Sequence, residues 1–256
     1  MKIFETHAHL DSDAFDKDRD QVIRRSLESG VKAIVNVGIN ADGSRASIAL
    51  AERWDHIWAT VGFHPADADT YDASLVKDLL QHPQVVALGE IGLDYYRDYT
   101  PRDLQRQVFE QQIGIAVERE MPIVVHCREA HDDCWDILAA SDAPAVVFHC
   151  YSGDEAFAER AFERGWHISF TGTVTYKNSA QGNLVRSVPR DRFFVETDCP
   201  YLSPHPHRGK RNAPFRLPLV VQRIAELKSL PPKAIAEQTW ENAARFFRLD
   251  KLLSRV

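Results

Sequence analysis

Eight short runs rich in valine, isoleucine and phenylalanine recur along this chain, separated by amphipathic, charge-bearing stretches. Runs of this length and composition predict buried β-strands. They cover residues 2–9, 31–38, 57–64, 85–92, 122–128, 145–152, 166–172 and 192–199. Between them, residues 102–120 place apolar side chains near a 3.6-residue repeat, which predicts a helix. A second helix is predicted over residues 154–165, where Gly165 stands at the position of a C-cap glycine.

Strands that alternate with helices in this way predict an α/β fold of the (β/α)8 TIM-barrel type. A doubly wound open sheet is the rival architecture. The length of 256 residues and the 44% hydrophobic content suit one large domain as well as two small ones. A barrel of eight strands needs the whole chain as one large domain, so we expect a single domain over residues 1–256.

Composition narrows the classes of function. The formal net charge of -6 excludes a bulk basic nucleic-acid binder, so any attraction for an anionic substrate has to be local. No apolar run approaches the roughly 18 residues of a membrane span, and no signal-peptide pattern opens the chain. The four cysteines form no CxxC pair. We therefore expect a cytoplasmic, reduced protein that is monomeric and has no membrane partner.

Polar side chains gather near the carboxyl ends of the predicted strands, which meet at one mouth in a barrel. A single histidine there is more often a hydrogen-bonded core or rim residue than a ligand, although His7 and His9 share one face of their strand. The whole set is harder to explain by packing, because each unpaired buried polar group costs about 1–3 kcal/mol. A divalent metal would satisfy these groups together. The residues near the strand ends are His7, His9, His64, Glu90, His126, His149, Glu196 and Asp198, and the metal hypothesis rests on four histidines and two carboxylates among them.

The motifs around these residues resemble the TatD family of metal-dependent deoxyribonucleases, and the resemblance spans nearly the whole chain. The matching stretches are THAHLD, VGFHP, GEIGLDYY, PIVVHCREAHDD, FHCYSG, TGTVTYKN, ETDCPYLSP and RGKRNAP. The resemblance implies a TatD-like TIM-barrel hydrolase with a two-metal site. One metal would be held by His7, His9 and Asp198 and the other by His126 and His149, with Glu90 bridging the two. Related barrels use a carbamylated lysine as the bridge.

The resemblance also implies the chemistry. Two divalent ions (Mg, Mn or Zn) would activate a water molecule and stabilise charge on a phosphodiester. Histidine-rich ligation favours zinc or manganese, whereas the family is usually described as magnesium-dependent. We expect Asp198, Glu90 and His64 to be catalytic: Asp198 ligates and accepts the proton of the attacking water, and His64 contacts the scissile phosphate. Glu196 would orient the ligands or add another, and Glu5 stands where the family commonly has aspartate.

Substrate contacts are expected from a basic loop beyond the last strand, with Arg208, Lys210 and Arg211, and from base stacking on Tyr95. Tyr96, Tyr99 and Tyr151 are further stacking candidates. The implied activity is 3′-5′ exonuclease action on DNA, best on single-stranded ends.

Two alternatives remain open. A small-molecule ester, amide or lactone hydrolase of the same barrel would have little use for the basic loop. A nucleic-acid or partner-binding protein with a vestigial site would be expected to have lost ligands, and none of the six is missing here.

Overall fold

The computed structural model describes residues 1–97 and 99–249. The chain forms two compact units. Of the described residues, one unit holds 1–36 and 168–249, and the other holds 37–97 and 99–167. The single domain expected over residues 1–256 stays a prediction.

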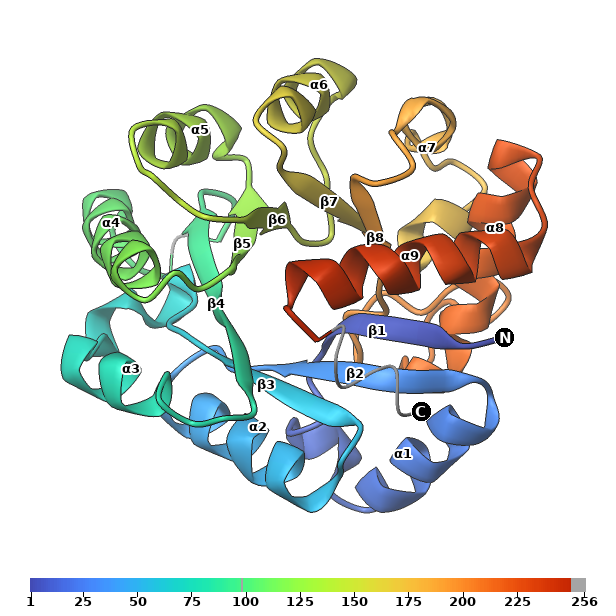
Figure 1. The fold of residues 1–256 in the computed structure, drawn as a ribbon, viewed down its shortest axis with the longest axis horizontal. Coiled ribbons are helices and arrows are strands. Elements are labelled where there is room, and N and C mark those ends of the chain that lie inside the picture. Colours follow the sequence, from blue (N-terminus) through green and yellow to red (C-terminus); the bar gives the residue numbers. More distant parts are fainter. Residues whose placement is uncertain (98, 250–256) are drawn as a thin grey trace. The chain divides into compact units, whose positions relative to one another are not determined.

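Within the described residues, eight strands lie where the sequence predicts them, in the sheet order β1 to β8. Each strand is followed by a helix, which is the alternation of the predicted (β/α)8 barrel (Figure 1). The strands are β1 Ile3–Ala8, β2 Val31–Val37, β3 Ile57–Val61, β4 Val85–Asp94, β5 Ile123–Arg128, β6 Val146–Phe148, β7 His167–Phe170 and β8 Phe193–Val195. Most are shorter than predicted, but β4 runs two residues further and ends at Asp94.

Side-chain hydrogen bonds cap the amino ends of some of the helices. Asp154, for example, accepts a hydrogen bond from the amide of Phe157 at 2.8 Å and so caps α6. The predicted C-cap is confirmed, because Gly165 follows that helix with φ +77°. The α-helices are α1 Arg19–Glu28, α2 Ala41–Arg53, α3 Ala73–Leu79, α4 Arg102–Glu118, α5 His131–Ala139, α6 Glu155–Glu163, α7 Gly182–Ser187, α8 Leu217–Lys228 and α9 Pro232–Phe246. The 3-10 helices are η1 Asp13–Phe15, η2 Pro65–Thr70, η3 Gly172–Thr175 and η4 Pro214–Arg216.

In the first unit, β1 pairs in parallel with β2, and β7 pairs in parallel with β8. An isolated parallel bridge between Ala8 and Cys199 joins β1 to the segment after β8. Helix α9 lies against β1 and β8 (Figure 1). Aromatic side chains at the carboxyl end of α9 pack on both of these strands. The ring centroid of Phe4 lies 5.9 Å from that of Phe247, and Phe194 lies 5.2 Å from Phe246. This apolar packing fixes β1 and β8 side by side.

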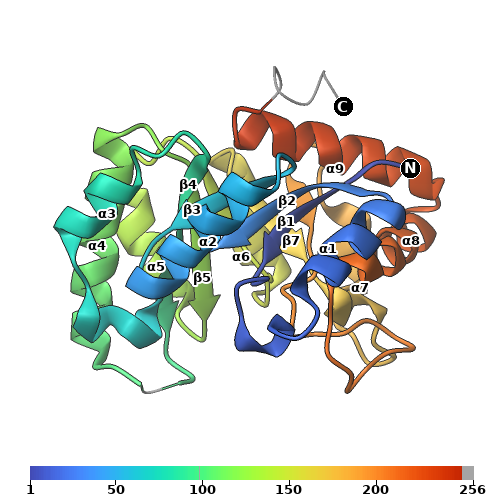
Figure 2. The ribbon, with the colours of Figure 1, turned by 90° about the horizontal axis from the view of Figure 1, so that it is seen from below.

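In the second unit, β3, β4, β5 and β6 pair in parallel and in chain order. The helices α2, α3 and α4 lie outside β3 and β4 (Figure 2). The register places Gly92 beside His126 and Val125 beside Phe148. Because parallel strands end at the same edge, this register brings the polar residues at the ends of β4, β5 and β6 together. Among the described helices, none is both long and apolar enough to cross a membrane.

Candidate metal centres

A first cluster of potential ligands, His7, His9 and Asp198, lies where β1 and β8 end. The backbone brings these residues together directly: the amide of Asp198 donates to the carbonyl of His7 at 3.0 Å, and the amide of His9 donates to the carbonyl of Cys199 at 2.9 Å. Asp198 takes a left-handed backbone conformation, φ +53°, which aspartate tolerates better than most residues. The pairing of β1 with the segment after β8 therefore builds this cluster.

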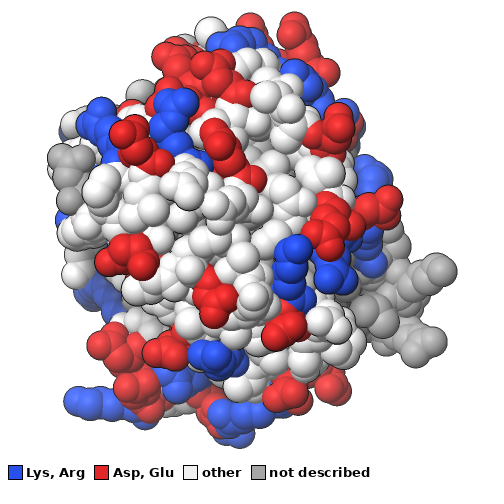
Figure 3. Space-filling model, turned by 90° about the vertical axis from the view of Figure 1, so that its left-hand side faces the viewer, with Lys and Arg blue, Asp and Glu red and all other residues white. Residues whose placement is uncertain are grey.

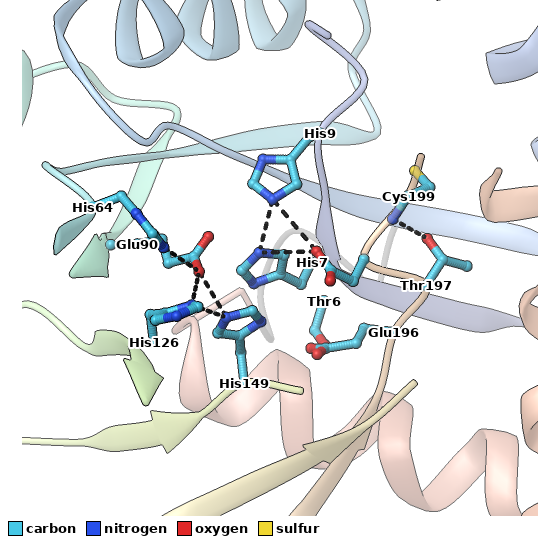
Figure 4. A network of polar contacts seen from close by, with 12 residues as sticks. Thr6, His7, His9, His64, Glu90, His126, His149, Glu196, Thr197 and Cys199 are labelled. Atoms are coloured by element: carbon cyan, nitrogen blue, oxygen red, sulfur yellow. Dashed lines mark hydrogen bonds and ion pairs between the residues drawn. The ribbon is translucent and has the colours of Figure 1, made fainter. Parts of the chain in front are cut away.

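The ring nitrogens of the first cluster face one another (Figure 4). Nε2 of His7 lies 3.2 Å from Nε2 of His9, and Oδ1 of Asp198 lies 3.5 Å from Nε2 of His9 and 3.9 Å from Nε2 of His7. A single proton can sit between two imidazole nitrogens that face each other. A cation placed between the three atoms would instead accept a lone pair from each of them.

Two buried glutamates form hydrogen bonds with the strand and the segment that carry the first cluster. Oε1 of Glu5 accepts hydrogen bonds from the amide of Thr197 at 2.8 Å and from the amide of His7 at 3.3 Å, so it ties β1 to the segment after β8. Burial raises the pKa of Glu5 well above its ordinary value, although hydrogen bonds from Thr197 work against that rise. Glu196 accepts a hydrogen bond from the hydroxyl of Thr6 at 3.3 Å. Both carboxyl groups lie where they can orient the strand that carries His7.

The second cluster comprises Glu90, His126 and His149, from the neighbouring strands β4 and β5 and the residue that follows β6 (Figure 4). Oε1 of Glu90 lies 2.7 Å from Nδ1 of His126 and 2.7 Å from Nε2 of His149. The two ring nitrogens are 3.3 Å apart. One carboxylate oxygen and two imidazole nitrogens thus converge on one point, as the sequence predicts for part of a metal centre.

His64 lies beside the second cluster but differs from it in one respect. Its Nδ1 accepts a hydrogen bond from the amide of Ala66 at 3.0 Å, so in the neutral ring the proton sits on Nε2. That nitrogen lies 3.8 Å from Oε1 of Glu90. Burial, with the neighbouring His126, lowers the pKa of His64 to about 3, so the ring is neutral near pH 7. His64 is therefore built to donate a hydrogen bond rather than to bind a cation through Nε2.

Asp94 is a site residue that the sequence reasoning missed. Its Oδ2 lies 3.2 Å from Nε2 of His126, and its Oδ1 accepts hydrogen bonds from the amides of Tyr96 at 3.0 Å and Arg97 at 2.8 Å. Burial alone would raise the pKa of Asp94, but the hydrogen bonds from His126 and Arg97 outweigh it and the pKa is lowered. The ionised carboxylate fixes the proton of His126 on Nε2 and turns the lone pair of Nδ1 toward the second cluster. Its position at the end of β4 was the available signal.

Both clusters fit a divalent cation by the chemistry of their donors. Atoms bound to one ion at about 2.0–2.1 Å lie about 2.8–3.0 Å apart at octahedral angles and about 3.3–3.4 Å apart at tetrahedral angles. The donor atoms lie 3.2, 3.5 and 3.9 Å apart in the first cluster, and 2.7, 2.7 and 3.3 Å apart in the second. A mixture of imidazole and carboxylate is a usual ligand set for zinc and manganese.

Some of the side chains predicted to contact the substrate are exposed, whereas others are held by neighbouring residues. Arg208 and Lys210 are exposed, as the basic-loop hypothesis requires. Arg211 instead forms a two-pronged ion pair with Asp18, with N–O distances of 2.6 and 2.9 Å, and has to leave it to bind a phosphate. The hydroxyl of Tyr95 donates to Oδ2 of Asp133 at 2.5 Å, and the guanidinium carbon of Arg102 lies 4.4 Å from the centroid of its ring. Tyr95 is therefore held in place by its neighbours.

Comparison with known proteins decides the family. The family model described as TatD related DNase matches residues 4–248. The chain belongs to the TatD family. It is 41% identical to "Uncharacterized metal-dependent hydrolase YabD" of Bacillus subtilis (strain 168), over 97% of this chain and 100% of that protein. It is 36% identical to "3'-5' ssDNA/RNA exonuclease TatD" of Pectobacterium atrosepticum, over 96% of this chain and 100% of that protein.

A solved structure supports the TatD assignment. The crystal structure of YJJV, a TatD homologue from Escherichia coli K12, superposes with a TM-score of 0.89 at 28% identity, covering 96% of this chain and 98% of that one. The chain is a (β/α)8 TIM-barrel protein, and the predictions of fold class and family from the sequence are confirmed. The doubly wound open sheet is thereby ruled out.

Proposed function

We propose that this TatD-family chain is a metal-dependent deoxyribonuclease that hydrolyses phosphodiester bonds. The observation that carries the proposal is that the predicted ligands form two compact donor clusters in a chain matched from end to end by proteins named as exonucleases. The alternative, a small-molecule ester, amide or lactone hydrolase, has less support, because those full-length relatives act on single-stranded nucleic acid by name.

We assign one divalent ion to each cluster. His7, His9 and Asp198 would hold one ion, and Glu90, His126 and His149 would hold the other. The histidine content favours zinc or manganese for tight binding, while magnesium or manganese is expected to support turnover. The bridging role that the resemblance gives to Glu90 stays a prediction. When bound, such ions supply a nucleophilic water at neutral pH and neutralise charge on the phosphoryl oxygens.

The side chains of this chain would accept the proton, bind the phosphate and position the ligands. Asp198 is a carboxylate at the rim of the first cluster, with a 13% exposed side chain, and would accept the proton of the attacking water. His64 would donate its Nε2 proton in a hydrogen bond to a phosphate oxygen, because its pKa of about 3 keeps the ring neutral and its tautomer is set by Ala66. Glu5 and Glu196 would hold β1 in register, and Arg208 with Lys210 would attract the substrate backbone.

The strandedness and the polarity of the substrate are inferred from the names of the relatives. Single-stranded DNA with a free 3′ end is the substrate that we propose, since several relatives with full-length similarity, among them that of Pectobacterium atrosepticum, are named for 3′-5′ action on single-stranded DNA and RNA. The monomeric state and the cytoplasmic location expected from the sequence stay predictions.

The test is a digestion with defined metals. The full chain is stripped with a chelator, reloaded with magnesium, manganese or zinc, and given single-stranded DNA labelled at the 5′ or at the 3′ end. Removal of nucleotides from the 3′ end gives a descending ladder with the 5′ label and an immediate mononucleotide with the 3′ label. Metal-loaded protein that releases nothing from DNA or RNA would refute the proposal.

The variant Glu90→Gln keeps the size of the side chain but removes the charge that pairs with His126 and His149. We expect it to lose activity by at least about a hundredfold, because a metal ligand is weakened. Glu110→Gln, a change of the same kind at an exposed position on α4, is the matched control. Circular dichroism establishes that both variants are folded.

A further inference from the structure

The loop between β4 and α4 carries two exposed aromatic side chains. Tyr96 is 54% exposed and Tyr99 is 65% exposed, whereas Tyr95 between β4 and these residues is held by Asp133. Two large aromatic rings left to solvent within four positions of the same loop are uncommon on a surface without a partner. Stacking on a flat ligand is what such rings do well.

Arginine side chains flank both rings. The guanidinium carbon of Arg128 lies 3.8 Å from the ring centroid of Tyr96. That of Arg97 lies 5.8 Å from the ring of Tyr96 and 5.9 Å from the ring of Tyr99. Within residues 1–97 and 99–249, no ion pair joins Arg97 or Arg128 to an acidic side chain. These cations remain available to an anion while they steady the rings.

The same residues are linked by hydrogen bonds to the second cluster. Asp94, which holds Nε2 of His126, accepts the amides of Tyr96 and Arg97 through its other oxygen. Arg128 is on β5 two residues beyond His126 and pairs in register with Asp94. The backbone carbonyl of Arg128 accepts a hydrogen bond from the amide of Tyr95 at 2.9 Å. A ligand on these rings therefore lies next to the candidate metal centre.

We propose that Tyr96, Arg97, Tyr99 and Arg128 form a tyrosine–arginine platform that binds the nucleotides of a single-stranded nucleic acid beside the second cluster. The rings stack on bases and the guanidinium groups pair with phosphates, and neither contact depends on the base sequence. Net charge does not provide the attraction, since the chain carries -6, and on the face in Figure 3 basic and acidic side chains are interspersed. The proposal deepens the nuclease assignment and rests on it for the choice of substrate.

The test measures binding separately from cleavage. The full chain is titrated, in chelator so that no turnover occurs, into a fluorescent thymidine oligonucleotide of about a dozen nucleotides, and anisotropy gives Kd. We expect Tyr96→Leu with Tyr99→Leu to raise Kd by at least about tenfold, because each lost stack weakens binding about fivefold or more. Tyr96→Phe with Tyr99→Phe keeps both rings and should bind within about twofold of wild type.

The charge contribution has its own variant. Arg128→Gln should weaken binding and reduce the slope of log Kd against log salt by about 0.7, the value for one contact to a single-stranded phosphate. Arg119→Gln removes an exposed arginine just past the carboxyl end of α4, opposite the end next to the platform, and should leave the slope unchanged. Thermal unfolding confirms that each variant is folded.

The outcomes separate this proposal from the nuclease assignment. Wild type that does not bind the strand, or a leucine variant that binds as tightly as wild type, overturns the platform whatever the cleavage assay gives. Ring-dependent binding without cleavage under any metal keeps the platform and overturns the nuclease assignment. If the protein cleaves the strand but the leucine substitutions leave Kd unchanged, the nuclease assignment stands and the platform is overturned.

Discussion

Asp94 and His126 form a carboxylate–imidazole pair, with Oδ2 of Asp94 3.2 Å from Nε2 of His126. The other oxygen of Asp94 accepts two backbone amides, so both oxygens of the side chain act as acceptors. An asparagine has one acceptor oxygen and one amide group that only donates. The single oxygen of an asparagine at this position can accept from the backbone amides or from His126, but not from both. Its amide group would then place a donor against the N–H of the remaining partner.

We therefore expect Asp94→Asn to weaken metal binding at the second cluster by about 10- to 100-fold, the usual effect of losing such a partner. Competition with a chromogenic chelator measures the affinity, and the imidazole N–H signal of His126 in NMR spectra reports the tautomer directly. Asp103→Asn, an exposed change of the same kind in the first turn of α4, is the control. Unchanged affinity with an unchanged imidazole signal would show that Asp94 does not set the tautomer.

The lowered pKa of His64 gives a prediction about acid stability. Between the ordinary value of 6.5 and the folded value of about 3, the unfolded chain binds a proton that the folded chain does not. Stability of the metal-free protein should therefore fall as pH drops through that window, by about 1.4 kcal/mol per unit from this group. His64→Asn, whose side-chain oxygen can still cap Ala66, removes this contribution. Urea unfolding at pH 7 and pH 4.5 should show a smaller loss for the variant than for wild type; equal losses would contradict the assignment.

Arg211 and Asp18 should contribute mainly to stability. Their side chains are 38% and 32% exposed, so the pair itself is worth about 0–1 kcal/mol. We expect Arg211→Gln to lower the free energy of unfolding by up to about 1 kcal/mol, with a coupling to Asp18→Asn in a double-mutant cycle. Arg208→Gln should weaken binding of the oligonucleotide without changing stability. A larger loss of binding for Arg211→Gln than for Arg208→Gln would reverse these two roles.

Metal content provides a separate check on the two clusters. We expect elemental analysis of the purified full chain to give two ions in wild type and one in either His7→Gln or Glu90→Gln, since each variant damages one donor set. Added metal at about a hundred times its Kd should stabilise the wild-type fold by about 2.7 kcal/mol for each site that it fills, seen as a rise in Tm. A single ion in wild type, or a variant that loses both, would contradict the assignment of one ion to each cluster.

Most of the strands, and the grouping of the candidate ligands, could be predicted because parallel strands impose one rule: residues at the carboxyl ends lie at the same edge. His7, His9, His126 and His149 lie within two residues of a strand end, whereas Glu90 lies four residues before the end of β4. Asp94 follows it too, and was missed only because β4 was expected to stop at residue 92. A strand end shifted by two residues conceals a candidate site residue, and strand ends are the least certain part of a sequence pattern.

Which of three neighbouring tyrosines faces solvent could not be read from local sequence. Tyr95 is tied down by Asp133 on α5 and Arg102 on α4, residues that only the folded chain brings to it. Tyr96 and Tyr99 are instead flanked by arginines and stay exposed. Exposure is a property of tertiary contacts, whereas the pattern of residues in a strand is local.

Glu5 and Thr197, joined by one hydrogen bond, are 192 positions apart in the chain. His7 and Asp198, whose backbones share a hydrogen bond, are separated by 191 positions. During synthesis the donor atoms of the first cluster therefore cannot converge until the segment around residue 198 has been translated. Any ion that this cluster binds would have to be captured after that point of synthesis.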